Sequence, residues 1–369
     1  MSTSSLLPSS TTGWIIYLLV TAAWIYLMFY GQKLQSMIWK NQIEGFLREM
    51  KVMSDAATAK LISAVVQRGK PNMDPSQRIK DFLEFFTIEP VDRDPNGVLK
   101  RLEYLLDVRE NRFDQEMARL APNASSEEQA NLAVAMEAAM ALNFIYRYIR
   151  HYLILGTKQN NWMILMQVAM SLGQIKEIAR SYEKAMNAFL DGKPIGDGVG
   201  PMVAHMLAAG ASMQEIEGTK TVFAKQEFEG RTLLILKAKG PGGRVGKPGE
   251  GVQRLIEGEA GKVKLIITVD AALKLEGDNS GEIVEGVGAA IGDPGPEKFK
   301  IEEAARTHNV PLLAIILKES MEEAITGMRK EIADAIPAAV EKVKQVIREQ
   351  TKPGDEVIIA GIGNSIGVA

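Results

Sequence analysis

Hydrophobic residues are most concentrated near the start of the chain. Residues 13–30 read GWIIYLLVTAAWIYLMFY and contain no charged side chain. An α-helix rises about 1.5 Å per residue, so this segment would extend over roughly 27 Å. That length is close to the hydrocarbon core of a bilayer, which is about 30 Å thick. The pattern predicts one amino-terminal transmembrane helix over residues 13–31, after a short tail of residues 1–12. Aromatic residues occupy the positions of interfacial anchors near both ends: Trp14, Tyr17, Tyr26, Phe29 and Tyr30.

The distribution of basic residues predicts the orientation of this helix. Lys33, Lys40, Arg48 and Lys51 follow the hydrophobic run, and no basic residue precedes it. The positive-inside rule therefore places the tail outside the cell and the bulk of the chain in the cytoplasm. A cleaved signal peptide would need a basic segment before the run and a small-residue cleavage site after it. A buried core helix would usually present one polar face. We therefore expect a single-pass protein of the cell membrane, with the lipid bilayer as a partner.

Residues 32–190 show the spacing of apolar positions that is typical of helices. This stretch contains few glycines and many residues that lose little conformational entropy in a helix. Glu137, Arg147 and Arg150 interrupt its most apolar part, which favours core helices over further membrane spans. We interpret the Met-rich run after Asn161 as core, with an adaptable partner-binding surface as the alternative. This all-helical cytoplasmic region is expected to contain helices over residues 32–67, from 75 to before Pro90, from 95 onward, from 126 to about 155, and over 161–190.

The pattern changes at residue 191, where glycine becomes frequent. Of the 33 glycines in the chain, 21 lie between residues 191 and 300. Short continuous apolar runs alternate here with helical patterns, which predicts an α/β domain with a largely parallel sheet over residues 191–369. The expected strands cover residues 232–238, 263–269, 311–317 and 356–360. The expected helices cover residues 250–257, 297–307 and 319–350, the last with a kink at Pro337.

Composition excludes several kinds of chemistry. The 43 basic and 46 acidic residues give a net charge of -3, so the chain has no broad cationic field, although a local patch remains compatible with that charge. The absence of cysteine excludes disulfides, thiol nucleophiles and thiolate metal sites. The three histidines, His151, His205 and His308, are widely separated, which disfavours a metal site built on imidazoles.

One glycine-rich loop has the composition of a phosphate-binding site. Residues 240–249 read GPGGRVGKPG, in which glycine amides, the start of a helix and two cationic side chains would surround an anion. The loop departs from the Walker signature because Pro241 replaces its first glycine and Pro248 replaces its hydroxyl residue. A mobile surface loop is the alternative. The candidate ligand-binding residues are Gly240, Gly242, Gly243, Arg244, Gly246, Lys247 and Gly249.

A second candidate lies after the predicted strand over residues 263–269. That strand delivers Asp270 to the sheet edge, where a carboxylate suits a magnesium ion or a ribose hydroxyl. We therefore add Asp270 to the ligand site and expect a nucleotide with magnesium as the candidate cofactor. Glu276 and Asp293 follow in an acidic segment and form, with Asp270, a weaker metal hypothesis. A solvated acidic loop is the alternative for this segment.

Two further glycine motifs resemble nucleotide-binding or nucleic-acid-binding elements. Residues 361–367 read GIGNSIG, close to a dinucleotide fingerprint, but only two residues follow, too few for the helix that fingerprint requires. Gly198 and Gly200 match the core of a helix-hairpin-helix element, yet Asp197 and Met202 stand where basic residues are expected. Nucleic acid is therefore a disfavoured partner. The alternative for this motif is a tight interhelical turn.

Several motifs together resemble one family. They are PIGDGVGPMVA, KGPGGRVGKPGEG, ITVDAALKLEG, EGVGAAIGDPG and AGIGNSIGV, in addition to the hydrophobic amino-terminal helix. In combination they are similar to the archaeal family known as domain of unknown function 1512. The resemblance covers nearly the whole chain and implies a membrane-associated protein, but it carries no catalytic residues over.

The residues themselves leave three functions open. The first is a membrane protein whose cytoplasmic domain binds a phosphorylated small molecule or a nucleotide near Gly242 and Asp270. The second is a structural or scaffolding protein that acts as a homo-oligomer. The third is a membrane-tethered nucleic-acid binder. Because no nucleophile can be paired with a base, the sequence predicts no reaction.

Overall fold

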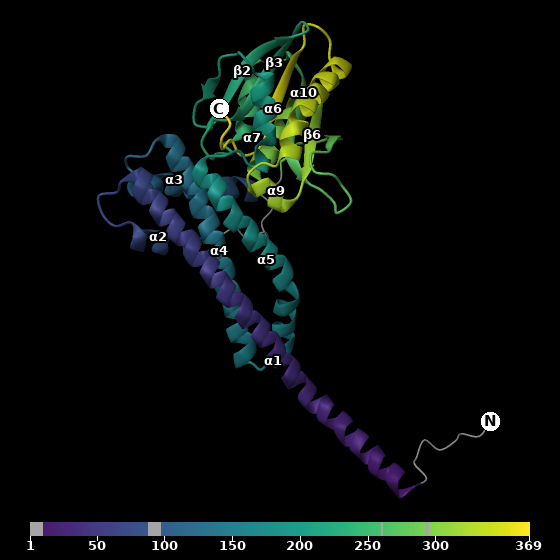
Figure 1. Cartoon of the computed structure of the whole chain (residues 1–369). Coiled ribbons are helices and arrows are strands. Elements are labelled where there is room, and N and C mark those ends of the chain that lie inside the picture. Colours follow the sequence, from purple (N-terminus) through teal and green to yellow (C-terminus); the bar gives the residue numbers. More distant parts are fainter. Residues whose placement is uncertain (1–9, 88–96, 260, 292–294) are drawn as a thin grey trace, which may run out of the picture. The chain divides into compact units, whose positions relative to one another are not determined.

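Figure 1 shows the computed structural model of the chain. The structure describes residues 10–87, 97–259, 261–291 and 295–369. The side chains of residues 27–29 are not described. Contacts between residues divide the chain into two compact units. Unit 1 comprises Met1–Asp55 with Asn143–Ala179, and unit 2 comprises Ala56–Leu142 with Arg180–Ala369. Three long helices contribute residues to both units: α1 (Thr11–Ala64), α4 (Ser126–Lys158) and α5 (Trp162–Asp191).

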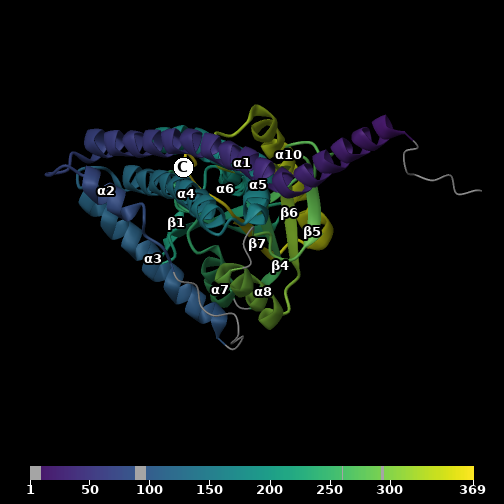
Figure 2. The ribbon, with the colours of Figure 1, turned by 90° about the horizontal axis from the view of Figure 1, so that it is seen from below.

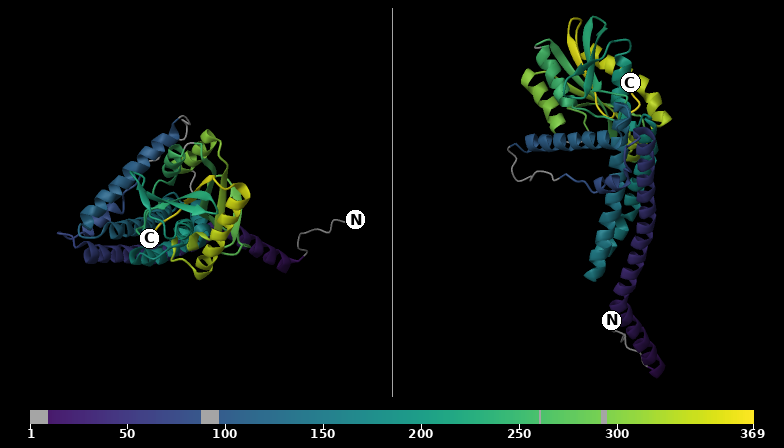
Figure 3. Two further views of the ribbon diagram at one scale, coloured as in Figure 1. Left: turned by 90° about the horizontal axis from the view of Figure 1, so that it is seen from above. Right: turned by 90° about the vertical axis from the view of Figure 1, so that its left-hand side faces the viewer.

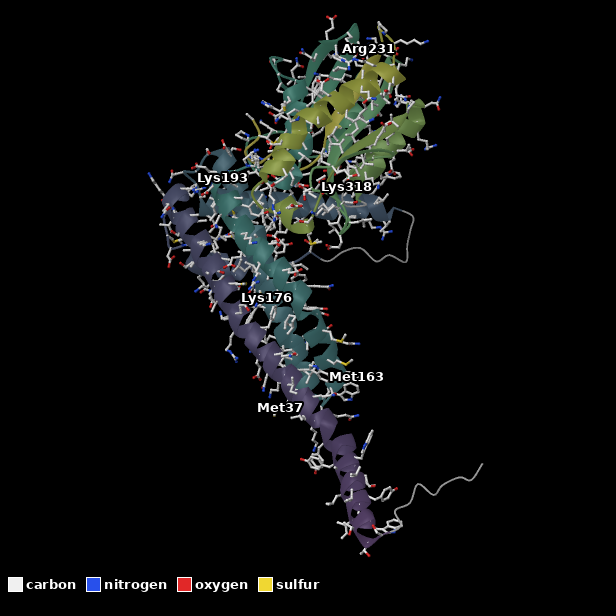
Figure 4. All side chains as sticks on the ribbon, turned by 45° about the vertical axis from the view of Figure 1, so that its right-hand side comes forward. Met37, Met163, Lys176, Lys193, Arg231 and Lys318 are labelled. Atoms are coloured by element: carbon white, nitrogen blue, oxygen red, sulfur yellow. The ribbon has the colours of Figure 1, made fainter. Side chains whose placement is uncertain are left out.

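Unit 1 is entirely helical over its described residues. Trp39 on α1 stacks on Trp162 at the start of α5, with ring centroids 6.1 Å apart. Lys176 on α5 forms an ion pair with Glu49 on α1, with a distance of 2.6 Å between the charged atoms. Apolar side chains nevertheless remain exposed, as at Met37 and Met163, which are labelled in Figure 4.

Among the described residues, one helix is long and apolar enough to cross a membrane, and a second is if a bent pair counts as one span. Helix α4 qualifies with 39% of its most apolar window buried, and α1 qualifies if Thr11–Tyr26 and Tyr30–Gly69 are taken as one span. Core helices of soluble proteins satisfy the same criteria. Within α1, the large apolar side chains from Trp14 to Val20 are all exposed.

The helical part of unit 2 begins with the end of α1, which runs into a π-helical turn, η1 (Val65–Gly69). Helix α2 (Ser76–Phe82) is much shorter than the sequence pattern predicts. Residues 88–96 lie outside the described residues, and they include Pro90 and the predicted start of the next helix at Pro95. Helix α3 covers Val98–Leu120. Helix α4 starts as expected, because Ser125 accepts a hydrogen bond from the Glu128 amide at 3.1 Å and donates its own amide to the Glu128 carboxylate at 2.9 Å.

The α/β domain contains a seven-stranded sheet in the order β1-β2-β3-β7-β4-β6-β5. The central strands β3, β7, β4 and β6 are parallel, whereas β1, β2 and β5 pair antiparallel at the two sides. The sheet is therefore mixed, and the prediction of a largely parallel sheet holds only for its centre. The strands are β1 (Gln214–Ile216), β2 (Thr221–Phe228), β3 (Arg231–Ala238), β4 (Val263–Leu273), β5 (Ile283–Val287), β6 (Leu312–Glu319) and β7 (Glu356–Gly361).

Helices cover both faces of this sheet (Figure 2). One face packs against α6 (Val199–Leu207) and α10 (Lys330–Gln350), and the other packs against α7 (Pro248–Gly258) and α8 (Pro296–His308). The helix predicted over residues 319–350 is in fact two helices, because α9 (Met321–Ile325) ends before α10 begins. Ser320 and Glu323 form a capping box that starts α9. Pro337 lies inside α10 without ending it.

Candidate functional site

A pocket of about 370 Å³ lies between the glycine-rich loop and the helices α3 and α4, all within unit 2. Its volume is at the lower end of the range for small-molecule sites. The described lining residues come from α3 (Leu106, Arg109, Glu110, Phe113, Asp114), α4 (Ala130, Ala133, Val134, Glu137), the β1–β2 turn (Lys220), the glycine-rich loop (Gly243, Arg244, Val245, Gly246) and the carboxyl-terminal segment (Asn364).

The carboxyl-terminal segment holds the glycine-rich loop in place. The Ser365 hydroxyl lies within hydrogen-bond distance of the carbonyl oxygens of Lys239, Gly242 and Arg244, at 3.2, 2.9 and 3.1 Å. The Gly367 amide donates to the Pro241 carbonyl at 2.8 Å. The terminal GIGNSIG motif resembles a dinucleotide fingerprint, but its contacts here are structural, because they hold the glycine-rich loop in place.

The loop that lines the pocket has backbone amides without an acceptor among the described residues. The Gly243 amide donates to the side chain of Asn131 at 2.8 Å. Within the described part of the chain, the next three amides, those of Arg244, Val245 and Gly246, have no hydrogen-bond acceptor. Gly246 has a φ of 66°, in the left-handed region. Successive amides in such a conformation form an anion-binding concavity.

The side chain of Arg244 adds a positive charge to this concavity. Its guanidinium donates to the carbonyl oxygen and the hydroxyl of Ser126, at 2.9 and 2.7 Å. Both acceptors are neutral, and the residues that the structure describes place no carboxylate within ion-pair distance of this guanidinium. The positive charge of Arg244 is therefore not paired with a carboxylate among the described residues.

The other charged side chains of the pocket are paired. Arg109 on α3 forms an ion pair with Glu137 on α4 at 2.6 Å. The Lys220 ammonium lies between Glu110 and Asp114, at 2.8 and 2.6 Å. Burial opposes the charged form of Lys220, but its two carboxylate partners outweigh this effect and raise the pKa of Lys220. Both signs of charge therefore line the pocket, and the excess positive charge lies on the side of the glycine-rich loop.

Two of the residues predicted to bind phosphate already have protein partners. The Lys247 ammonium pairs with Asp107 on α3 at 2.8 Å. The amides of Gly249 and Glu250 at the start of α7 both donate to one carboxylate oxygen of Glu297, at 2.7 and 3.1 Å. An internal carboxylate thus occupies the helix amino terminus where we expected a phosphate. Gly240 and Gly242 allow the loop to pack closely on neighbouring segments. A Cβ at Gly240, for example, would overlap the carbonyl oxygen of Val368.

Asp270 lies on β4 but does not line this pocket. Its side chain is 3% exposed and accepts a hydrogen bond from the Ala271 amide at 2.7 Å. Glu276 is exposed in the turn after β4, and Asp293 lies outside the described residues. Across the ranges that the structure describes, no group of three His, Cys, Asp or Glu side chains has the spacing of a metal site. The structure therefore does not bring Asp270 together with the glycine-rich loop.

Gly198 and Gly200 are buried where α6 crosses the sheet. Gly198 ends the short 3₁₀ turn η2 (Gly196–Gly198), and Gly200 lies in the first turn of α6. A Cβ at Gly200 would come closer than 3.0 Å to the carbonyl oxygens of Ile362 and Val269. These glycines allow a helix to pack tightly on strand ends.

Sequence patterns did not reveal two neighbouring carboxylates, Glu319 at the end of β6 and the half-buried Asp197 in η2. Glu319 at the end of β6 is 2% exposed, and neither of its carboxylate oxygens has a hydrogen-bond partner among the described residues. Burial, together with the nearby charges of Asp197 and Glu323, raises the pKa of Glu319 to about 8. Burial also raises the pKa of Asp197 to about 6, although the Asn364 amide bonds to its carboxylate. Glu319 is therefore largely protonated at neutral pH.

The polar residues of α3 and the turn residue Lys220 were also missed as site residues. The sequence does hold a signal for them, because Glu103, Asp107, Glu110 and Asp114 recur at helical spacing and form one acidic stripe. The glycine-rich loop has the stronger sequence signal, because its composition differs more from that of ordinary secondary structure.

This chain is thus a two-part protein, in which a helical amino-terminal region precedes an α/β domain with a mixed sheet. A family model described as "Protein of unknown function (DUF1512) N-terminal domain" matches residues 16–192. A second, described as "Domain of unknown function (DUF1512) C-terminal", matches residues 195–369. The protein belongs to the DUF1512 family, as its motifs predicted. No curated protein matches the chain.

Proposed function

We propose that the protein is a membrane-anchored binding protein whose cytoplasmic α/β domain, together with α3 and α4, binds a phosphorylated small molecule or a nucleotide. The observation that carries this proposal is the set of three unpaired amides, Arg244 to Gly246, in a pocket of about 370 Å³. A phosphate group is the ligand chemistry that best matches them, because its oxygens accept several N–H bonds at once.

The rest of the pocket supports a ligand that carries more than phosphate. Glu137 provides carboxylate oxygens that accept hydrogen bonds from hydroxyl or amino groups. Phe113 and Val134 provide apolar surface for a ring. Because the described residues offer no ready group of three metal ligands, magnesium would arrive with the phosphates of a nucleotide.

Membrane anchoring is the second part of the proposal. Exposed apolar side chains cover α1 from Trp14 to Val20, and a membrane would remove them from water. The basic residues after this segment favour a cytoplasmic location for the pocket. Nucleotides and phosphorylated metabolites would then have direct access to it.

Replacing Arg244 tests the ligand proposal. We expect Arg244→Ala to weaken the binding of the best ligand at least about tenfold, because a charge-assisted hydrogen bond to phosphate is lost. The measurement is isothermal titration calorimetry on the full-length protein in detergent, with pyrophosphate, ATP and GTP, each with and without magnesium.

Arg306→Ala is the matched control for this experiment. Arg306 is an exposed cation on α8 that pairs with Glu303 on the same helix at 2.6 Å, and it does not line the pocket. We expect its replacement to leave the affinity unchanged. Equal losses in both variants would indicate general electrostatic attraction, and no binding by the folded wild-type protein would reject the proposal.

Charges placed in the hydrophobic segment test the anchor. The double variant Val20→Asp and Ala23→Asp should release the protein from membranes washed with alkaline carbonate, since two buried aspartates cost about 5 kcal/mol or more. The control is the apolar exchange Val20→Ala with Ala23→Val, which should stay in the membrane pellet. Retention of the double aspartate variant in the pellet would contradict a spanning helix.

A further inference from the structure

The acidic stripe of α3 is paired with a row of lysines on the α/β domain. Glu103 pairs with Lys300 on α8 at 2.6 Å, and Asp107 pairs with Lys247 at 2.8 Å. One and two turns further along α3, Glu110 and Asp114 share Lys220. The right-hand view of Figure 3 shows α3, in blue, running beneath the strands and helices of the domain. Carboxylates at successive turns of one helix thus meet ammonium groups from three separate elements.

Two of these lysines depend on α3 for their neutralisation. Lys300 also pairs with Glu297 on its own helix at 3.1 Å, so it keeps a partner without α3. Among the described residues, Lys220 and Lys247 have carboxylate partners on α3 alone. Without those carboxylates, both ammonium groups would stand unneutralised, Lys220 in the same pocket as Arg244 and Lys247 in a hollow of about 170 Å³ that Lys220 also lines. The α3 carboxylates therefore occupy positions that suit the oxygens of a phosphate chain.

The amino-terminal part of α3 is joined to the domain by these ion pairs, and its apolar residues, such as Leu99, Leu102 and Leu105, are at most half-buried. The buried residues of α3, Phe113, Glu116, Met117 and Leu120, all lie in its last two and a half turns. From Val98 to Arg112 no side chain is buried. Partly exposed ion pairs contribute little stability each and weaken as salt screens them. This stretch of α3 is therefore the part of the pocket wall that is displaced most easily.

We propose that the acidic face of α3 is an internal competitor that a phosphorylated ligand displaces from Lys220 and Lys247. The inference rests on the proposed function of the pocket and adds to it a mode of regulation. Ligand phosphates would take the place of the carboxylates of Asp107, Glu110 and Asp114, and the segment Val98–Arg112 would separate from the domain. Ligand binding would thereby be coupled to the release of this segment of α3 from the domain.

A charge-neutralising variant of α3 tests this inference. The triple variant Asp107→Asn, Glu110→Gln, Asp114→Asn keeps the shape of each side chain and removes the competing charges. We expect this variant to bind ATP or tripolyphosphate about tenfold more tightly than the full-length wild-type protein does. The reason is that the three carboxylates no longer compete with the ligand phosphates for Lys220 and Lys247. A charge-matched control, Asp334→Asn, Glu341→Gln, Glu349→Gln on α10, should show a much smaller gain.

Hydrogen exchange on the wild-type protein provides a second readout that does not depend on the folding of a variant. We expect exchange in residues 98–112 to accelerate when ATP or tripolyphosphate is added, or when potassium chloride is raised from about 50 to about 500 mM, while residues 113–120 stay protected. Unchanged or weaker binding by the α3 variant, with ligand bound normally by the wild type, would overturn the competition and leave the proposed function standing. Absence of binding by both proteins would overturn both.

Discussion

Replacing Glu319 by glutamine should stabilise the protein at alkaline pH and leave it almost unchanged at acidic pH. The ordinary pKa of a glutamate is near 4.5, and in the folded protein that of Glu319 is raised to about 8. Below pH 4.5 the folded and unfolded states are both protonated, so Glu319 carries no penalty. As the pH rises from 4.5 to 8, the unfolded state ionises first and stability is lost. A shift of this size corresponds to at most about 5 kcal/mol.

Thermal denaturation followed by circular dichroism measures this effect on the full-length protein in detergent. We expect the Glu319→Gln variant to melt several degrees above the wild type at pH 8.5 and within error of it at pH 5. Glu349→Gln, which removes a carboxylate from the exposed end of α10, is the control and should show no such pH dependence. A variant that melts below the wild type at pH 8.5 would mean that the Glu319 carboxylate has a stabilising partner.

Replacing Gly200 by alanine should destabilise the α/β domain strongly. In most helices this exchange adds up to about 1 kcal/mol of stability, because glycine is a poor helix former. Here a Cβ would overlap two backbone carbonyl oxygens, those of Ile362 and Val269, which cannot move without displacing β7 and β4. We expect a net loss of about 3 kcal/mol, at the upper end for overpacked sites, or failure to fold.

Gly173→Ala is the matched control for this prediction. Gly173 lies within α5, and no atom comes within 4 Å of the place where its Cβ would stand. The same substitution should therefore raise the melting temperature slightly there and lower it sharply at Gly200. Similar melting temperatures for the two variants would contradict the close approach of α6 to the strands.

Most of the long helices and the central strands followed from the spacing of apolar residues. Strands β3, β4, β6 and β7 are continuous apolar runs because helices cover both of their faces. The strands that the sequence did not predict, β1, β2 and β5, are partly exposed and mix polar with apolar residues. They are also the antiparallel ones, and for that reason the sheet is mixed where a largely parallel sheet was expected.

The site was predictable only in part, because its partners come from distant parts of the chain. The composition of the loop around Arg244 pointed to anion binding, and that loop does line the pocket. The sequence could not show that Glu297 would occupy the start of α7, or that Asp107 would pair with Lys247. Those contacts join residues separated by many positions, and only the folded chain brings them together. Similarly, the burial of Glu319 depends on the packing of η2 against the end of β6.

Amide hydrogen exchange at the glycine-rich loop tests the central proposal most directly. The amides of Arg244, Val245 and Gly246 have no acceptor among the described residues, so they should exchange rapidly in the free protein. Saturating ATP or pyrophosphate, added to the full-length protein in detergent, should slow exchange in a peptide that covers residues 243–247. Unchanged exchange in that peptide while a ligand binds, or protection confined to another region, would contradict phosphate binding at this loop.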